Sequence, residues 1–140
     1  MKILILCTGN SCRSQMAEGL FKSFNQMLEV YSAGTKPAAI VSPYAIKVMN
    51  EIGIDISKNK PKDVVGYLRQ DFDYVITVCD NAKETCPVFT GNTKHRIHMG
   101  YDDPGDTEGT YDDILEAHRN VRDAMKKDFY KFYLSCLKQD

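Results

Sequence analysis

Short apolar stretches alternate with amphipathic helical patterns along this chain, and this alternation narrows its possible folds more than any other feature. Residues 2–6 (KILIL) predict a strand that is buried on both faces. A polar turn at residues 8–11 separates this strand from a helical pattern, which places Met16, Leu20 and Phe24 on one side. Further strands are predicted at residues 28–33, 73–79 and 95–98.

Three later segments carry helix signals. Ser42-Pro43 provides a cap followed by a proline at the first helical position, and Gly53 marks the end of that helix. A short helix is predicted over residues 63–69. A long helix is predicted from Tyr111, and its apolar stripe should consist of Ile114, His118, Val121, Met125, Phe129, Phe132 and Cys136.

Strands that alternate with helices predict βαβ units, in which a mainly parallel sheet lies between helical layers. We therefore expect a single α/β domain of three layers that spans residues 1–140. Binding crevices in such folds lie beyond the carboxyl ends of the strands. Cys7, Cys79 and the loop after His98 all follow predicted strands, so they should meet at one edge of the sheet.

The composition excludes several classes of function. A formal net charge of -1 argues against nucleic-acid binding, which usually requires an excess of Lys and Arg. No apolar run approaches the roughly 20 residues that cross a membrane, and residues 1–6 are too short for a secretory signal. We expect a monomeric cytoplasmic protein. The five cysteines then indicate catalytic, metal-binding or buried thiols rather than a disulfide framework.

The most specific motif joins the first strand to the first helix. We call it the anion loop, and it comprises Cys7, Thr8, Gly9, Asn10, Ser11, Cys12, Arg13 and Ser14. A short loop in this position can aim backbone N–H groups at an oxyanion such as phosphate, with help from the helix dipole. Gly9 permits the backbone bend, and Asn10 tolerates left-handed geometry. Arg13 can bind two oxygens of the anion.

The anion loop also supplies a candidate nucleophile. The helix dipole and the Arg13 guanidinium should hold Cys7 as a thiolate, and the Ser14 hydroxyl could donate to its sulfur. The alternative is a structural turn whose cysteine is merely buried. A phosphatase also needs an acid for the leaving group, and Asp102 and Asp103 are both candidates. We choose Asp103, although the sequence alone does not separate the two.

A second pair of cysteines, Cys79 and Cys86, flanks a polar segment that is compatible with a helix. In a helix their Cα atoms would be about 10 Å apart at about 1.5 Å per residue, whereas a disulfide requires about 7 Å or less. The pair could therefore close only if the segment unwinds. Its spacing does not fit a zinc site, and inert buried thiols are the other alternative. We interpret Cys12 and Cys136 as bystanders, with Cys136 packed in the core.

These motifs resemble those of the thioredoxin-coupled arsenate reductases, which are built on the low-molecular-weight tyrosine phosphatase fold. The loop motif is shared with the phosphatases, whereas the pair Cys79 and Cys86 is specific to the reductases. The resemblance implies a four-stranded parallel sheet in the order 2-1-3-4. It covers nearly the whole chain, through residues 7–19 (CTGNSCRSQMAEG), 31–34 (YSAG), 55–57 (DIS), 78–87 (VCDNAKETCP), 101–104 (YDDP) and 121–123 (VRD).

The resemblance also implies a mechanism. Cys7 would attack arsenate bound in the anion loop while Asp103 protonates the departing oxygen. Cys79 would then attack Cys7 and expel arsenite, and Cys86 would resolve the disulfide that results. Thioredoxin would reduce the final Cys79–Cys86 disulfide, so no bound redox cofactor is implied.

Some members of this family bind potassium beside the loop. Asn10, Glu18 and Ser32 match three of the ligands, but the fourth, an aspartate, is displaced by one position to Asp63. The phosphatase relatives carry Tyr directly after the Asp-Pro of the acid loop to pack the substrate ring. This chain has Gly105 there, which weakens phosphotyrosine recognition.

Two other functions stay open at this stage. The first is a low-molecular-weight protein-tyrosine phosphatase, which would hydrolyse phosphotyrosine through a cysteinyl-phosphate intermediate. The second is a non-catalytic thiol sensor or arsenite-binding protein. Such a protein would need the three sulfurs, but neither Arg13 nor Asp103 in a reactive role.

Overall fold

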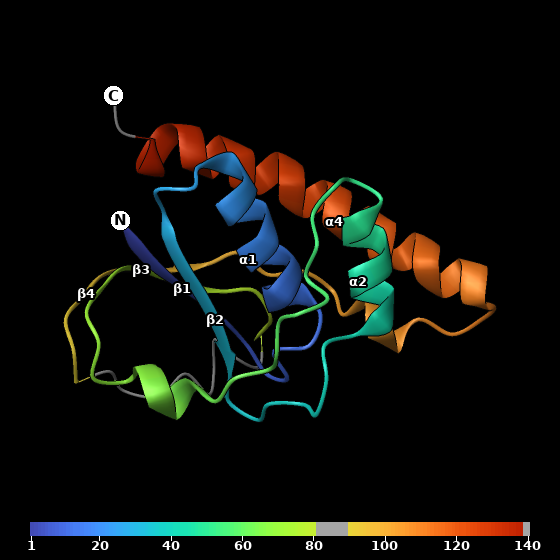
Figure 1. Ribbon diagram of the computed structural model, residues 1–140, viewed down its shortest axis with the longest axis horizontal. Coiled ribbons are helices and arrows are strands. Elements are labelled where there is room, and N and C mark those ends of the chain that lie inside the picture. The colour runs from blue at the N-terminus through green and yellow to red at the C-terminus, as the bar shows by residue number, and fades with distance from the viewer. Residues whose placement is uncertain (81–89, 139–140) are drawn as a thin grey trace.

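The computed structural model describes residues 1–80 and 90–138 of the chain. A four-stranded parallel sheet forms its centre, with the strands in the order β2-β1-β3-β4 (Figure 1). This order confirms the one that the family resemblance implied. Every predicted strand is present, and its ends differ from the prediction by at most two residues. The strands are β1 (Lys2–Cys7), β2 (Glu29–Gly34), β3 (Phe72–Thr77) and β4 (Thr93–His98).

The helices lie where the sequence predicted them, with two differences in length. Ser42 caps the second helix as expected, because its hydroxyl accepts a hydrogen bond from Ala45 N. This helix ends at Asn50, and Gly53 forms the turn that follows with a φ of +80°. The helix predicted over residues 63–69 is only a short 3₁₀ turn. The elements are α1 (Arg13–Phe24), α2 (Pro43–Asn50), η1 (Val64–Tyr67), η2 (Pro104–Asp106) and α4 (Tyr111–Phe132).

Helical elements cover both faces of the sheet, as the three-layer prediction requires. On β2 the Ser32 hydroxyl donates to Glu18 of α1, whereas the ring of the adjacent Tyr31 packs against Tyr67 of η1. Successive side chains of a strand point to opposite faces, so α1 and η1 lie on opposite sides. Figure 1 shows the long α4 lying across α1 and α2, with which it is in contact.

The buried stripe of α4 differs from the predicted one. Leu115 and Arg122 are buried, whereas Ile114 and Val121 are only half-buried. The prediction passed over Arg122 because its side chain is charged. Its guanidinium is nevertheless satisfied in the interior, where it donates to Val48 O at 2.9 Å and to Glu51 at 2.7 Å.

The placement of Cys136 in the core is wrong. The helix continues beyond α4 as a π-helical turn over Tyr133–Leu137. This wider turn directs Tyr133 and Leu137 into the core, and Cys136 is exposed.

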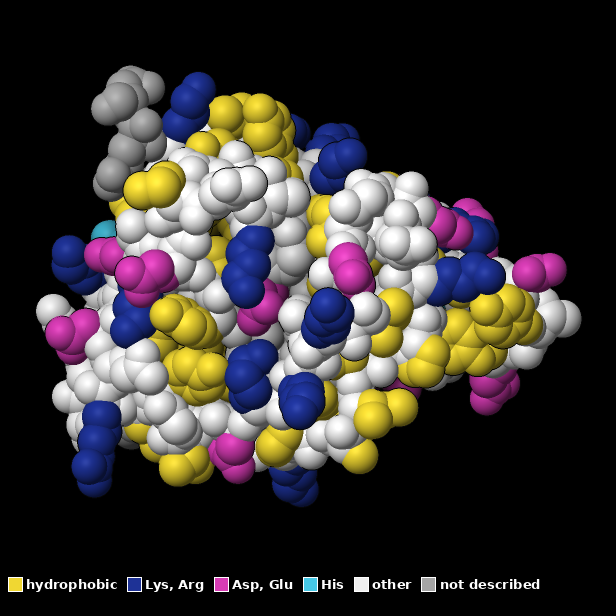
Figure 2. All heavy atoms as spheres, in the orientation of Figure 1, with side chains coloured by type: hydrophobic (Ala, Val, Ile, Leu, Met, Phe, Trp, Pro, Cys, Tyr) yellow, Lys and Arg dark blue, Asp and Glu magenta, His cyan; other side chains and the backbone are white. Residues whose placement is uncertain are grey.

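The surface carries both signs of charge. On the face shown in Figure 2, Lys and Arg side chains are interspersed with carboxylates, in keeping with a net charge of -1. Among the described helices, none is long and apolar enough to cross a membrane.

Candidate active site

The backbone carbonyls of the anion loop are held by the segment that follows β2. In a trans peptide unit the C=O group and the following N–H group point in opposite directions, and the described residues contain no cis peptide. The N–H groups of Thr8, Gly9, Asn10 and Cys12 consequently point away from that segment, as an oxyanion cradle requires. The bonds are Thr35 N to Cys7 O (3.3 Å), Lys36 N to Thr8 O (2.9 Å), Ala38 N to Gly9 O (2.8 Å) and Ser42 N to Ser11 O (2.7 Å).

Asn10 makes the bend of the loop and is fully buried. Its φ of +51° is left-handed, as predicted. The side-chain amide donates to the Ser14 hydroxyl at 2.8 Å, and the side-chain oxygen accepts from Lys62 N at 2.9 Å and from Gln15 at 3.2 Å. The sequence analysis did not single out Gln15 or Lys62, and Lys62 reaches Asn10 from 52 residues further along the chain. The donation from Ser14 to Cys7 stays a prediction.

The glycine that the anion loop needs most is Gly34 rather than Gly9. A Cβ on Gly9 would make ordinary contacts, the nearest at 3.8 Å from Ser11 Oγ. A Cβ on Gly34 would collide with the carbonyl oxygen of Thr8 and lie 3.1 Å from Asn10 N. The end of β2 therefore meets the loop backbone to backbone, which the sequence did not reveal.

Cys7 and Cys79 meet at the carboxyl edge of the sheet, as predicted. The register pairs Leu6 of β1 with Thr77 of β3, so the chain leaves both strands side by side. Both thiols are buried. A hydrogen bond with Cys79, together with burial, raises the pKa of Cys7, whereas the Arg13 charge and the Thr8 backbone N–H lower it.

The contact with Cys79 therefore opposes the predicted thiolate at Cys7, whereas Arg13 favours it, and the ionic state of Cys7 stays a prediction. Two thiols in contact do not both ionise readily, because the second negative charge would lie beside the first. The contact with Cys79 thus raises the pKa of Cys7 and opposes its ionisation. Burial, with a smaller contribution from Asp103, also raises the pKa of Cys12 to about 12. Cys12 is thus an unreactive thiol in this environment, in line with its interpretation as a bystander.

Arg13 connects the anion loop to the predicted acid loop. One guanidinium nitrogen donates to Tyr101 O at 2.8 Å, and another lies 3.6 Å from a carboxylate oxygen of Asp103. Tyr101 is held in turn by α4, because its hydroxyl donates to Asp128 at 2.8 Å. Asp102 is exposed. Asp103 therefore lies beside Arg13 of the anion loop, and the choice of Asp103 as the acid stays a prediction.

His98 joins the ends of β3 and β4, a role that the sequence did not indicate. Its Nδ1 lies 2.7 Å from Thr77 Oγ1 and its Nε2 lies 2.9 Å from Asp80 Oδ1. Because Asp80 directly follows Cys79, these contacts fix the chain where it leaves that cysteine. Cys86 and the helix-compatible segment before it lie outside the described residues.

The three residues that match potassium ligands gather in the interior beside the anion loop. Asn10, Glu18 and Ser32 are all buried. The Glu18 carboxylate accepts a hydrogen bond from Ser32 at 2.9 Å, and the ammonium groups of Lys22 and Lys62 lie 3.1 and 3.8 Å from it. Within residues 1–80 and 90–138, no three His, Cys, Asp or Glu side chains form a cluster suited to a metal ion.

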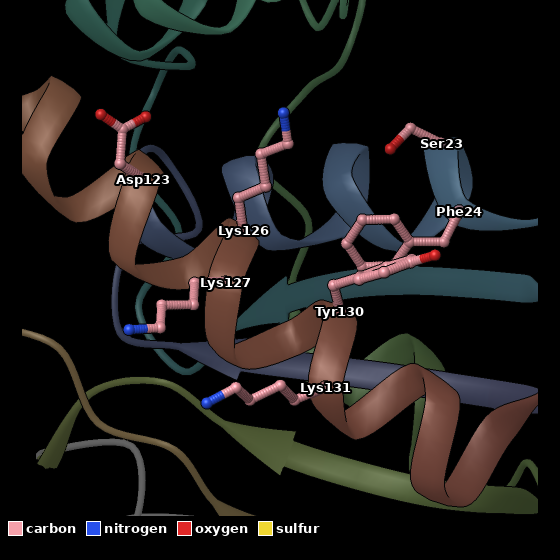
Figure 3. A pocket seen from close by; sticks show the side chains of 7 residues that line it. All are labelled: Ser23, Phe24, Asp123, Lys126, Lys127, Tyr130 and Lys131. Atoms are coloured by element: carbon pink, nitrogen blue, oxygen red, sulfur yellow. The ribbon is translucent and has the colours of Figure 1, made fainter.

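A groove of about 570 Å³ lies between α1 and α4 (Figure 3). The rings of Phe24 and Tyr130, whose centroids are 5.2 Å apart, form its apolar part. None of its lining residues belongs to the anion loop or to residues 101–104. The chemistry of the anion loop is therefore not located in this groove.

Comparison with known proteins agrees with the fold and the loop. Residues 2–139 match the family model described as low molecular weight phosphotyrosine protein phosphatase. The chain belongs to this family. An arsenate reductase from Halalkalibacterium halodurans is 47% identical to this chain over 126 residues, which are 89% of each protein.

Solved structures of arsenate reductases share this fold. One, described as an arsenate reductase in the phosphate binding state, is 30% identical with a TM-score of 0.77, and the match covers 96% of this chain and 97% of that one. A thioredoxin-dependent arsenate reductase from Corynebacterium glutamicum is 27% identical with a TM-score of 0.65, and the match covers 96% of this chain and 62% of that one.

Adding a methyl group at Gly34 should disturb the anion loop. We expect Gly34→Ala to lower the free energy of unfolding by about 1–3 kcal/mol, because the new Cβ would press on loop backbone. Urea denaturation measures the change. Gly66→Ala is the matched control, since a Cβ there meets nothing within 4 Å, and its effect should stay within about 1 kcal/mol. Equal effects of the two substitutions would contradict this reading of Gly34.

Removing Cys79 should make Cys7 more acidic. Because the contact with Cys79 raises the pKa of Cys7, Cys79→Ala should lower that pKa and move the pH midpoint of Cys7 alkylation to lower pH. Mass spectrometry of the Cys7 peptide after pulses of iodoacetamide across a pH series measures the midpoint. Cys136→Ala, which removes an exposed thiol, should leave the midpoint in place. A midpoint that stays or rises in Cys79→Ala would refute the coupling.

Proposed function

We propose that this protein is an arsenate reductase that passes electrons through three cysteines. The contact between the buried thiols of Cys7 and Cys79 carries this proposal. Ester hydrolysis by a cysteine nucleophile needs one thiol, whereas reduction of As(V) to As(III) takes two electrons. A second thiol against the nucleophile is therefore what a reductase requires and a phosphatase does not. The name of the relative from H. halodurans supports the same reaction.

In the first step Cys7 would bind arsenate covalently. The arsenate dianion is a base, so it can accept the proton that Cys7 holds. The thiolate then displaces one arsenate oxygen, and that oxygen leaves as water after it receives a proton from Asp103. Arg13 and the loop N–H groups stabilise the charge on the other oxygens, as donors fixed in advance of the reaction do.

In the second step Cys79 would reduce the bound arsenic. The Cys79 sulfur attacks the Cys7 sulfur, and a Cys7–Cys79 disulfide forms. The bond between sulfur and arsenic breaks, its electron pair stays on arsenic, and arsenite leaves as As(III). The two thiols thereby supply the two electrons.

In the last step Cys86 would attack Cys79 and release Cys7. The thioredoxin dithiol then reduces the Cys79–Cys86 disulfide and returns all three thiols. This step requires the segment between the two cysteines to unwind, and the thioredoxin dependence of the C. glutamicum relative supports it. A cytoplasmic location follows from the same chemistry, because thioredoxin keeps thiols reduced there.

The relay predicts that Cys86 is needed only after the first turnover. With thioredoxin, thioredoxin reductase and arsenate, the wild-type protein should oxidise NADPH continuously. Cys86→Ser should release one arsenite per protein molecule and then stop. Cys136→Ser is the matched control and should keep full turnover, because that thiol is exposed and outside the relay.

Three outcomes would contradict the proposal. Continuous turnover in Cys86→Ser would remove Cys86 from the reaction. Absence of NADPH oxidation in the wild type, with glutaredoxin and glutathione tested in parallel, would favour a phosphatase if the protein hydrolysed phosphotyrosine. Absence of both activities would favour a thiol sensor.

The two acidic residues of the acid loop should differ in their effect on the rate. Asp103→Asn should lower kcat/KM for arsenate by about 10²-fold or more, as the loss of a general acid does. Asp102→Asn should stay close to the wild type, since Asp102 is exposed. Steady-state kinetics with saturating thioredoxin measures both. A larger loss of kcat/KM in Asp102→Asn than in Asp103→Asn would show that Asp103 is not the general acid.

A further inference from the structure

Glu18 is a buried carboxylate next to a loop that should attract anions. Its side chain is only 5% exposed, and a buried charge is costly unless a cation or hydrogen bonds compensate it. In the family, potassium can provide the cation. Whether potassium fits here depends on which groups already surround the oxygens that would bind it.

Those oxygens are engaged by groups of the protein itself. Asn10 Oδ1 accepts hydrogen bonds from Lys62 N and Gln15, and Glu18 Oε1 accepts one from Ser32. The Lys62 ammonium lies 3.8 Å from the same Glu18 oxygen. A potassium ion bound to this oxygen would therefore lie beside a positively charged ammonium.

The fourth expected ligand also faces elsewhere. Asp63 is exposed, and its carboxylate accepts a hydrogen bond from Val65 N at 2.9 Å, where it caps η1. The donor set thus lacks a second carboxylate and contains an extra cation. Potassium does not fit these residues.

We propose that the Lys62 ammonium takes the place of a potassium ion and makes the anion loop independent of that ion. Lys62 is then a positioning residue, which acts on the reaction through Asn10 and Glu18. Its backbone N–H fixes the side chain of Asn10, the residue that bends the loop, while its ammonium compensates the charge of Glu18. One residue thereby couples the internal cation to the shape of the cradle.

Lys22 also pairs with Glu18, but it does not have this double role. Its side chain is 53% exposed, whereas that of Lys62 is 34% exposed, and solvent-exposed ion pairs contribute little to stability. Lys22 pairs with Glu18 within α1, one turn along the helix, and its position does not depend on the loop. The comparison of the two lysines therefore separates positioning of the loop from neutralisation of Glu18.

The test combines two lysine substitutions with a change of salt. Wild-type protein is compared in potassium, sodium and choline chloride of equal ionic strength, by its Tm, by calorimetric binding of inorganic phosphate, and by arsenate turnover. All three readouts should be the same in the three salts. Lys62→Met should lower the Tm and weaken phosphate binding several-fold, whereas Lys22→Met should change both much less.

Lys62→Asp tests whether a potassium site returns when the lysine is replaced by a carboxylate. This change removes the ammonium and places a carboxylate beside Asn10, Glu18 and Ser32. We expect potassium, but neither sodium nor choline, to raise its Tm and strengthen its phosphate binding. Lys62→Met should show no such response, because it adds no oxygen ligand.

Three results would overturn the inference: wild-type Tm or phosphate binding that rises specifically with potassium, equal losses in Lys62→Met and Lys22→Met, or no potassium response in Lys62→Asp. Only the turnover readout rests on the proposed reductase function. If the wild type showed no arsenate turnover while the Tm and phosphate results held, the reductase proposal would fail and the role of Lys62 would stand.

Discussion

The orientation of a few peptide units after β1 is the constraint on which the whole site depends. The N–H groups of the anion loop can face an oxyanion because the carbonyls of the same units are bonded to residues 35–42 on the other side. That segment comes close enough because Gly34 brings β2 against the loop and Asn10 takes a left-handed conformation. The cradle is therefore a property of the backbone, and Arg13 and Asp103 act on a geometry that already exists.

Part of this arrangement could be predicted from the sequence because its signals are local. The apolar stretches predicted the strands, and the motif between Cys7 and Arg13 predicted an anion loop with Asn10 at its bend. What the sequence did not show has two origins. Gly34 ends a strand as predicted, but its approach to Thr8 is a contact between distant segments, whereas the exposure of Cys136 comes from a local turn. Neither the close approach of β2 to Thr8 nor the π-helical turn leaves a periodic pattern in the sequence.

Charge balance at the site also depends on contacts between distant segments. The ionic state of Cys7 was predicted from its helix and from Arg13, whereas the contact with Cys79 acts in the opposite direction and comes from another strand. The family match named Asn10, Glu18 and Ser32 as possible ligands, but it did not show that Lys62 lies next to Glu18. A family motif identifies which groups can bind an ion, and only the packing shows whether another cation is already there.

The parallel register gives the two buried thiols a joint property that neither would have alone. Thr8 and Cys79 are 71 residues apart in the chain, yet their side chains touch because β1 and β3 end at the same edge. A thiol that keeps its proton is a poor nucleophile and resists oxidation. In the proposed reaction a basic oxyanion removes that proton only when it occupies the cradle. Cys79, which would supply the second electron, would thus also protect Cys7 from oxidation until substrate arrives. Both effects follow from the register that places β1 and β3 side by side.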